Sequence, residues 1–84
     1  PASRAEQLLS KRGSLTLRNT SLADALFTIS ETWEVNLLFS EDISGNVSGV
    51  FRDVTLRELL GSVLIANGYG YRPKGQSLIV KLQS

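Results

Sequence analysis

The chain has 84 residues, of which 42% are hydrophobic and 20% are charged, and its net charge is +1. This composition is typical of one small globular domain and excludes disordered, collagen-like and coiled-coil chains. Because the chain contains no Cys and no His, disulfides, thiol nucleophiles, imidazole bases and zinc sites are excluded, and we expect a binding or assembly module without catalytic residues, metal ligands or cofactor.

The N-terminal part of the chain predicts a short leading segment and then a strand. Residues 1–13 are polar around a small apolar cluster, which indicates an N-terminal tether or short helix. We expect the folded domain to occupy residues 14–84. Leu15 and Leu17 alternate with polar residues, and this period of two predicts a half-buried strand over 14–18.

The next elements are a helix and two strands. Ser21 is a suitable N-cap, and the apolar residues that follow it lie on one face of a helix predicted over 22–33, where we expect Trp33 in or beside the core. The apolar run at 35–39 and the alternating stretch at 47–54 each predict a strand. The stripe of the helix comprises Leu22, Ala25, Leu26, Ile29 and Trp33.

A second helix is signalled at both of its ends. Thr55 and Glu58 form a capping box, in which the hydroxyl accepts the amide of residue 58 and the carboxylate accepts the amide of residue 55. Asn67-Gly68 supplies the left-handed stop. Apolar residues at helical spacing lie between these signals: Leu56, Leu59, Leu60, Val63 and Leu64.

The C-terminal residues predict a hairpin, with strands around 69–72 and 77–82 and a turn at 73–76. The whole order is β-α-β-β-α-β-β. We therefore predict an α+β fold in which two helices pack between small two- and three-stranded sheets.

The sequence also contains an internal repeat. A shift of 34 residues aligns residues 17–22 with residues 51–56, and the apolar positions of the two predicted helices continue the match. A period of this length is also that of helical tetratricopeptide arrays, but each unit here begins and ends with strand-like sequence. We interpret the repeat as one β-α-β unit used twice.

Charged residues give little support to catalysis. The ends of the chain are basic and residues 19–58 are acidic, which is typical of a solvated surface. Glu41-Asp42 is the one adjacent carboxylate pair, but sequential neighbours point apart, whereas a glycosidase needs two carboxyl groups about 5–10 Å apart across a bond. We interpret this pair as a solvated turn.

The C-terminal hairpin leaves one hypothesis of another class open. Tyr69 and Tyr71 are interleaved with Arg72 and Lys74, the composition of a strand that stacks bases. The alternative function is therefore weak binding of single-stranded nucleic acid. The competing interpretation is that the tyrosines pack on the core, and we favour a chain without a nucleic-acid partner.

Unpaired strand edges are the physical feature that most favours protein binding. Small sheets expose edge strands, and natural proteins leave an edge open mainly where a partner uses it. We expect the strands at 14–18 and 77–82 to be edges to which a neighbouring domain, subunit or peptide adds a strand. The candidate partner-binding residues are Leu15, Leu17, Leu78, Val80 and Leu82.

Several short sequence segments occur in a characteristic order over residues 14–82: SLTLRNTSLADAL, NLLF, ISGNV, the capped TLRELL and ANGYGY. Together they resemble the short N-terminal domain shared by bacterial secretins and TonB-dependent transducers. The family often has Gly at the end of its first helix, where this chain has Glu34, and Glu adopts a left-handed backbone less easily. The segments at 17–22 and 44–47 resemble the sequences of secretins more than those of transducers.

The resemblance implies a periplasmic domain of an outer-membrane protein. In a secretin of a type II or type III secretion system or a type IV pilus system, it implies a non-catalytic module that contacts neighbouring domains, other subunits of a homo-oligomeric ring, or an inner-membrane assembly component. In a transducer, it implies a signalling domain that contacts an anti-sigma regulator. The sequence contains no Met, and we expect it to be part of a longer exported protein.

Overall fold

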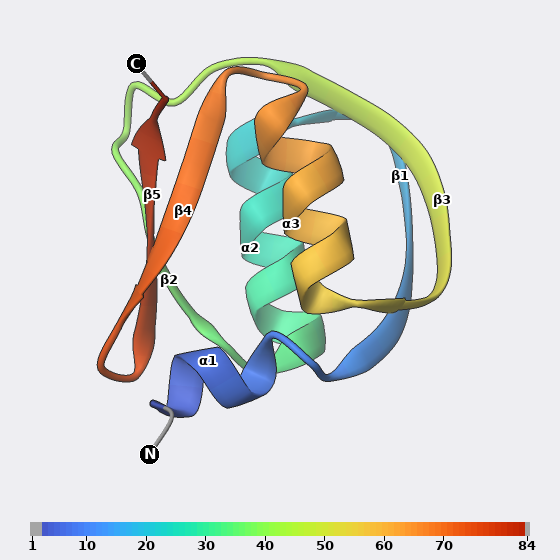
Figure 1. The fold of residues 1–84 in the computed structure, drawn as a ribbon. Coiled ribbons are helices and arrows are strands. Elements are labelled where there is room, and N and C mark those ends of the chain that lie inside the picture. Colours follow the sequence, from blue (N-terminus) through green and yellow to red (C-terminus); the bar gives the residue numbers. More distant parts are fainter. Residues whose placement is uncertain (1–2, 84) are drawn as a thin grey trace.

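The computed structural model describes residues 3–83, which contain three helices and five strands (Figure 1). The strand and helix order is the predicted one, preceded by a short additional helix, so the α+β prediction is confirmed. In chain order the elements are α1 (Arg4–Leu8), β1 (Arg12–Ser21), α2 (Leu22–Trp33), β2 (Asn36–Leu38), β3 (Asn46–Thr55), α3 (Leu56–Ile65), β4 (Tyr69–Lys74) and β5 (Ser77–Leu82).

Two sheets enclose the helices. β1 and β3 form an antiparallel two-stranded ribbon on one side of α2 and α3, and the three-stranded sheet lies on the other side (Figure 1). In that sheet the order is β2-β5-β4, with β5 parallel to β2 and antiparallel to β4. This is the predicted arrangement of two helices between a two-stranded and a three-stranded sheet.

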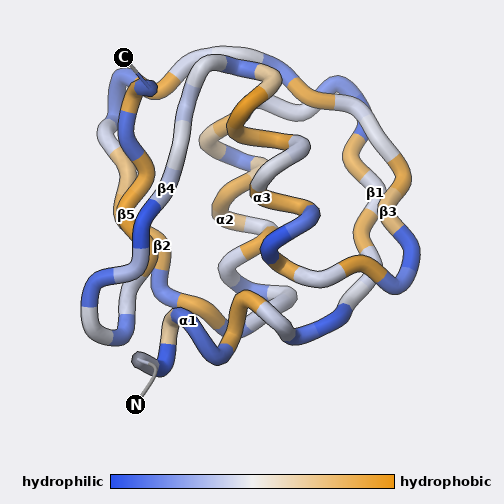
Figure 2. Tube along the Cα trace, in the orientation of Figure 1, coloured by the Kyte–Doolittle hydropathy of each residue, from blue (hydrophilic) through white to orange (hydrophobic). Residues whose placement is uncertain are grey.

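The core lies between the helices and the inner faces of both sheets. Figure 2 shows hydrophobic residues recurring along α2 and α3, with more hydrophilic residues between them. Trp33 is 1% exposed, which confirms the predicted place of this side chain. The stripe residues of both helices are buried, and so are residues before and after them: Ala5, Leu8, Leu9, Leu17, Val35, Tyr69, Leu78 and Val80.

The predicted ends of the helices agree with the structure. The Ser21 hydroxyl accepts the amide of Asp24 at the start of α2, and Thr55 and Glu58 form the complete capping box at the start of α3. Gly68 follows α3 with φ +84°, the left-handed conformation that the stop signal predicts. Glu34 caps α2 with φ 55°, so this chain uses Glu where Gly would fit without strain.

The internal repeat is reproduced in the ribbon. Asn19 and Asp53 occupy equivalent positions of the two units, and both have positive φ at an irregularity of the β1–β3 pairing. The Asn19 amide donates to the Ser48 hydroxyl at 2.8 Å, and the Asp53 amide donates to the Ser14 hydroxyl at 3.1 Å. Each bulge is therefore held by a serine of the opposite strand.

The same symmetry continues where the ribbon meets the helices. The Leu22 amide donates to the Gly45 carbonyl at 2.8 Å, and the Leu56 amide donates to the Lys11 carbonyl at 3.0 Å. Both bonds satisfy the first amide of a helix, which has no partner within the helix. The two β-α units are thus related by an approximate two-fold axis through the ribbon.

The N-terminal segment packs as part of the same core. A capping box between Ser3 and Glu6 starts α1, whose Ala5 and Leu8 are buried. The structure places α1 within residues 1–13, where a tether or short helix was expected. β1 then begins at Arg12, two residues before the domain boundary that the sequence predicted.

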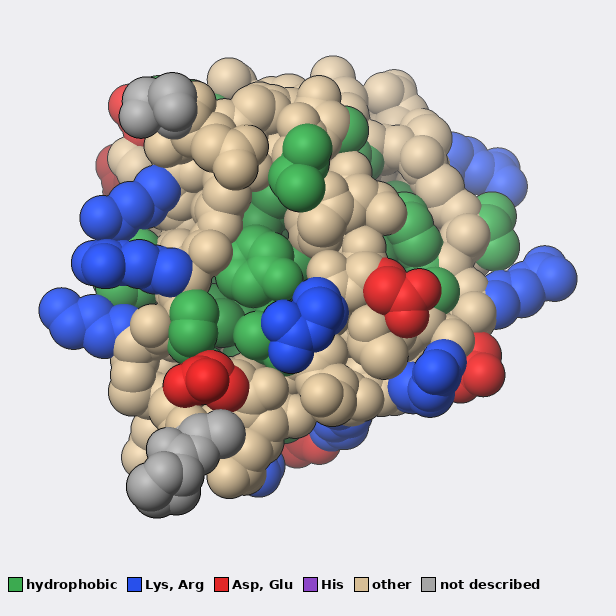
Figure 3. Space-filling view, in the orientation of Figure 1, with side chains coloured by type: hydrophobic (Ala, Val, Ile, Leu, Met, Phe, Trp, Pro, Cys, Tyr) green, Lys and Arg blue, Asp and Glu red, His purple; other side chains and the backbone are tan. Residues whose placement is uncertain are grey.

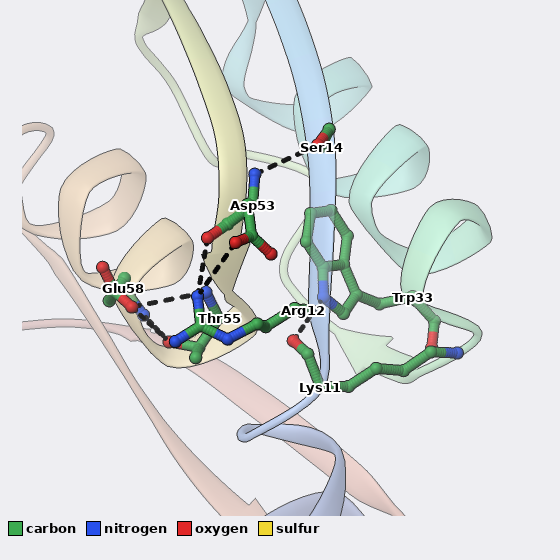
Figure 4. A network of polar contacts seen from close by, with 7 residues as sticks. All are labelled: Lys11, Arg12, Ser14, Trp33, Asp53, Thr55 and Glu58. Carbon is green, nitrogen blue, oxygen red and sulfur yellow. Dashed lines mark hydrogen bonds and ion pairs between the residues drawn. The ribbon is translucent and has the colours of Figure 1, made fainter.

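Two hydrogen bonds join this segment to the end of α2 (Figure 4). The Trp33 indole nitrogen donates to the Lys11 carbonyl at 2.8 Å, and the Lys11 ammonium donates to the Trp33 carbonyl at 3.3 Å. Gly13 passes so close to the indole that an added Cβ would lie 2.7 Å from Trp33 Cζ2. The absence of a side chain at Gly13 lets β1 cross the face of the indole.

The C-terminal hairpin turns more tightly than the sequence predicted. β4 continues through Pro73 to Lys74, which pairs with Ser77, so Gly75-Gln76 alone forms the turn. Gly75 has φ +63°. A two-residue turn with positive φ matches the twist of the flanking strands, which explains why both strands extend to it.

Candidate protein-binding surfaces

The prediction that residues 77–82 form an edge strand is wrong. β5 is the central strand of its sheet, with β4 along one side and β2 pairing Ser77–Ile79 on the other. Leu78 and Val80 are buried against the helices, and only Leu82, at 74% exposure, is open to solvent. A central strand has few free backbone groups, so a partner cannot add along the whole length of β5.

The strand that contains residues 14–18 is an edge. β1 pairs only with β3, so the other side of this ten-residue strand is unpaired within the described chain. Leu17 is buried and Leu15 is half-buried, so both side chains face the helices. What β1 can offer a partner is its unpaired backbone and its outward side chains, among them Thr16 and Arg18.

The other edges of the described chain are less suited to strand addition. β2 has three residues, and β4 contains Pro73, which has no amide hydrogen to donate. β3, the second strand of the ribbon, has ten residues and contains no Pro. Val50, at the middle of β3, is 60% exposed. The ribbon therefore has the two longest unpaired edges in the described chain.

The structure separates the aromatic and basic residues of the hairpin. Tyr69 is buried, and its hydroxyl accepts the Ser44 amide at 3.0 Å. Tyr71 lies on the same inner face, packed against the core. Arg72 and Lys74 alternate with the tyrosines and point outward. The hairpin therefore does not present the interleaved rings and cations on which the nucleic-acid hypothesis rested.

The acidic pair lies in an exposed loop. Glu41 and Asp42 are both exposed between β2 and β3, as expected for a solvated turn. Within residues 3–83, no group of three acidic side chains is placed to hold a metal ion. None of the described helices combines the length and apolar character that crossing a membrane requires.

Sequence reasoning missed two grooves beside the three-stranded sheet. One, of about 350 Å³, lies between α2 and the chain from Leu37 to Glu41. In it, Phe27 packs edge-on against Phe39 with ring centroids 5.2 Å apart, and yet Phe27 is 58% exposed. The sequence does contain an indication of this groove, because Phe27 is a large apolar residue outside the apolar stripe of its helix.

The second groove lies where β2 ends. Its volume is about 360 Å³, and the loop from Ser40 to Ile43 forms one wall while the last residues of β5 form the other. β2 pairs with β5 only as far as Ile79, so Val80–Leu82 has no strand on this side. The sequence carries no signal for this groove, because it depends on the pairing of β2 with β5.

Comparisons with known proteins support the fold. No protein-family model matches this chain, and no curated protein matches its sequence. A dimeric mutant of the N-terminal domain of the secretin XcpQ from Pseudomonas aeruginosa is similar, with a TM-score of 0.71 and 19% identity over 83% of this chain. The N0 domain of the type II secretin from enterotoxigenic Escherichia coli is similar too, with a TM-score of 0.71 and 20% identity over 84% of this chain.

These matches differ in how much of the other protein they cover. This chain spans 94% of the Escherichia coli N0 domain but 36% of the XcpQ structure. A further structure of the XcpQ N-terminal domain is matched with a TM-score of 0.68 and 17% identity, over 86% of this chain and 36% of that one. The chain therefore has the fold of secretin N-terminal domains, which confirms at the level of fold the resemblance seen in the sequence.

Proposed function

We propose that this chain is a periplasmic protein-interaction and assembly module of a bacterial outer-membrane secretin, and that it has no catalytic activity. Its likeness in fold to N-terminal domains of secretins supports this proposal. The secretin would belong to a type II or type III secretion system or to a type IV pilus system. Its partners would be neighbouring domains or subunits of the secretin ring, or an inner-membrane assembly component.

We infer the mode of binding from the unpaired edges of the β1–β3 ribbon. An extended segment of a partner adds to such an edge through main-chain hydrogen bonds, and side chains that alternate along the strand provide the specificity. β1 and β3 each have ten residues, whereas the other edges in the described chain are short or contain Pro73. We infer that the partner adds its strand to the ribbon.

Photo-crosslinking in living cells tests this function. A photoreactive amino acid is placed at Thr16 or Arg18, two exposed residues of β1, in the full-length parent protein. The control position is Ser62, which is exposed on α3 and belongs to neither strand of the ribbon. Mass spectrometry then identifies the crosslinked proteins. We expect the β1 positions to crosslink to a component of the secretion or pilus machinery, or to the secretin itself, and Ser62 to give little product.

One result would refute the proposed function, and another would refute only the proposed docking surface. Crosslinks from Thr16 and Arg18 to an anti-sigma regulator would assign the chain to a TonB-dependent transducer. Crosslinks to the secretion machinery from Ser62 alone would retain the secretin but move its docking surface from the ribbon to α3.

A further inference from the structure

Asn67-Gly68 lies at the junction between α3 and β4 and is the one Asn-Gly pair in the sequence. Gly68 is exposed and Asn67 is half-buried. α3 and β4 lie on the side of the molecule that faces the viewer in Figure 3, so water reaches this junction. Asn followed by Gly is prone to deamidation, because Gly has no side chain to obstruct the attack of its amide nitrogen on the Asn side chain.

The reaction needs no reactant other than water. The Gly68 amide nitrogen loses its proton and forms a bond to Cγ of Asn67. The bond from Cγ to Nδ2 breaks, so a succinimide ring closes, and the leaving ammonia takes up the proton that the amide nitrogen lost. Water then opens the ring at one of its two carbonyl carbons. Opening at Cγ gives aspartate, whereas opening at the main-chain carbonyl gives isoaspartate, whose backbone is longer by one carbon atom.

Hydrogen bonds of the native fold hold both reacting groups in unreactive positions. Asn67 Nδ2 donates to the Val63 carbonyl at 3.1 Å, so the carboxamide points back along α3 and away from the residue that follows it. The Gly68 amide donates to the Ile65 carbonyl at 3.1 Å. An amide bonded in this way keeps its proton and is not free to turn toward Cγ. Both bonds must therefore break before the ring can close.

The loop before β3 also covers the carboxamide. Gly45 lies so close to Asn67 that an added Cβ would overlap Oδ1 and lie 2.8 Å from Cγ. The loop is itself held by two hydrogen bonds, in which the Tyr69 hydroxyl accepts the Ser44 amide at 3.0 Å and the Gly45 carbonyl accepts the Leu22 amide at 2.8 Å. The attacked carbon is thus accessible only when the end of α3 and this loop separate.

We propose that Asn67 is a site of spontaneous deamidation that the native fold protects, so that the modification forms when the junction between α3 and β4 opens. Neither product returns to Asn, so an opening that lasts long enough for the ring to close leaves a permanent mark on the chain. The inference concerns the chemistry of this chain's own backbone and does not depend on the proposed function.

Both products should weaken the junction. Aspartate at this position has no hydrogen to donate to the Val63 carbonyl, and its negative charge would lie against that carbonyl. Isoaspartate adds a backbone carbon directly before Gly68, whose carbonyl accepts the Gln83 amide at 2.9 Å, and before Tyr69, which pairs with Leu82. We therefore expect the modified chain to unfold at a lower denaturant concentration than the original chain.

Incubation of the whole chain at mildly alkaline pH, with and without guanidinium chloride, tests the proposal. Mass spectrometry follows the gain in mass that replacement of NH2 by OH produces. The tryptic peptide from Glu58 to Lys74 is diagnostic, because Asn67 is its only side-chain amide. We expect this peptide to be modified in the unfolded chain and about thirtyfold more slowly in the folded chain, as expected if two hydrogen bonds of ordinary strength must break first.

Asn46 is the matched control within the same chain. It is exposed at the start of β3, directly after Gly45, but Val47 follows it, and a β-branched side chain hinders the attack. Its peptide should stay unmodified in both solutions. Gly68→Ala, measured in denaturant, should also suppress the modification of Asn67, because the added Cβ obstructs the attacking nitrogen.

Tyr69→Phe tests the protection by the loop. The variant removes the hydroxyl that accepts the Ser44 amide, so the loop should uncover Asn67 more often. Deamidation in buffer should become about fivefold faster, as expected for the loss of one hydrogen bond that holds a local structure. The rate in denaturant should stay the same, because the unfolded chain has no loop contact to lose.

Several results would overturn the proposal. The folded and unfolded chains could deamidate at the same rate, or Asn67 could remain unmodified in the unfolded chain. Tyr69→Phe could leave the rate in buffer unchanged, which would show that the loop does not control access to Asn67. Modified chain, returned to buffer, could have the same denaturation midpoint as the original chain, which would refute the predicted weakening of the junction.

Discussion

Replacing Gly13 by Ala should strongly destabilise the fold. The new Cβ would lie 2.7 Å from Cζ2 and 2.9 Å from Cε2 of Trp33, whereas ordinary contact begins at 3.4 Å. The indole cannot easily retreat, because it is 1% exposed and its nitrogen is bonded to the Lys11 carbonyl at 2.8 Å. Overpacking of this kind costs about 1–3 kcal/mol, and a displaced indole would lose a hydrogen bond of about 1 kcal/mol.

We expect a net loss of about 2 kcal/mol, because Ala also restricts the unfolded chain and thereby returns about 0.4–1 kcal/mol. Urea denaturation followed by circular dichroism measures the change in the free energy of unfolding. In a domain of this size, the loss corresponds to a fall of about 8–16 °C in Tm. Gly61→Ala is the matched control: an added Cβ there meets nothing within 4 Å, and Ala in the interior of α3 should stabilise by about 0.5–1 kcal/mol.

A double-mutant cycle identifies the cause of the loss. Trp33→Phe removes the second ring of the indole, so Gly13→Ala should cost less than about 0.5 kcal/mol in that background. The reasoning is refuted if Gly13→Ala is neutral in the original chain, or if its cost is the same with Phe at position 33.

Three further substitutions test individual contacts. Glu34→Gly should raise the free energy of unfolding by up to about 1 kcal/mol in urea denaturation, because Glu34 is held at φ 55°. A lower free energy of unfolding would mean that the exposed ion pair of Glu34 with Lys11 contributes more than such pairs usually do. Thr55→Ala should lower the same quantity by about 1 kcal/mol and Thr55→Ser should change it little, so equal losses for Ala and Ser would contradict a capping role. Tyr69→Phe removes the acceptor of the Ser44 amide, and hydrogen exchange at Ser44 should become about fivefold faster; unchanged exchange would show that this bond does not hold the loop.

The elements that could be predicted from the sequence are those with local signals. The apolar spacing from Leu22 to Trp33 predicted the bounds of α2. The N-cap Ser21 directly precedes the helix, and Trp33, the last apolar residue of the stripe, is also its last residue. The Thr55–Glu58 capping box fixed the start of α3 in the same way. Such signals depend on neighbours within one or two turns, and a single sequence displays them.

The position of β5 in its sheet could not be predicted in this way. Its parallel pairing joins residues 36–38 to residues 77–79, which are far apart in the sequence. Alternation of buried and exposed residues is the same in a central strand as in an edge strand, so the pattern of Leu78 and Val80 did not distinguish them. The sequence therefore predicted correctly that β1 is an edge strand and wrongly that β5 is one.

Alternation along β4 is a sequence signal that argues against the nucleic-acid hypothesis. Residues of one parity in a strand share a face, so Tyr69 and Tyr71 must point away from the side that carries Arg72 and Lys74. The groove between α2 and β2 is different: it needs β2 to pack beside α2, and only Phe27, outside the apolar stripe of its helix, indicates a surface there.

The symmetric bulges of the ribbon imply that the two halves of this chain secure each other. Ser14 belongs to the first β-α unit but holds the bulge at Asp53 of the second, and Ser48 of the second unit holds the bulge at Asn19 of the first. A substitution that weakens one half therefore also destabilises the other. The ribbon behaves like the interface of a dimer whose two protomers are joined in one chain, and neither half has a complete set of supports without its counterpart.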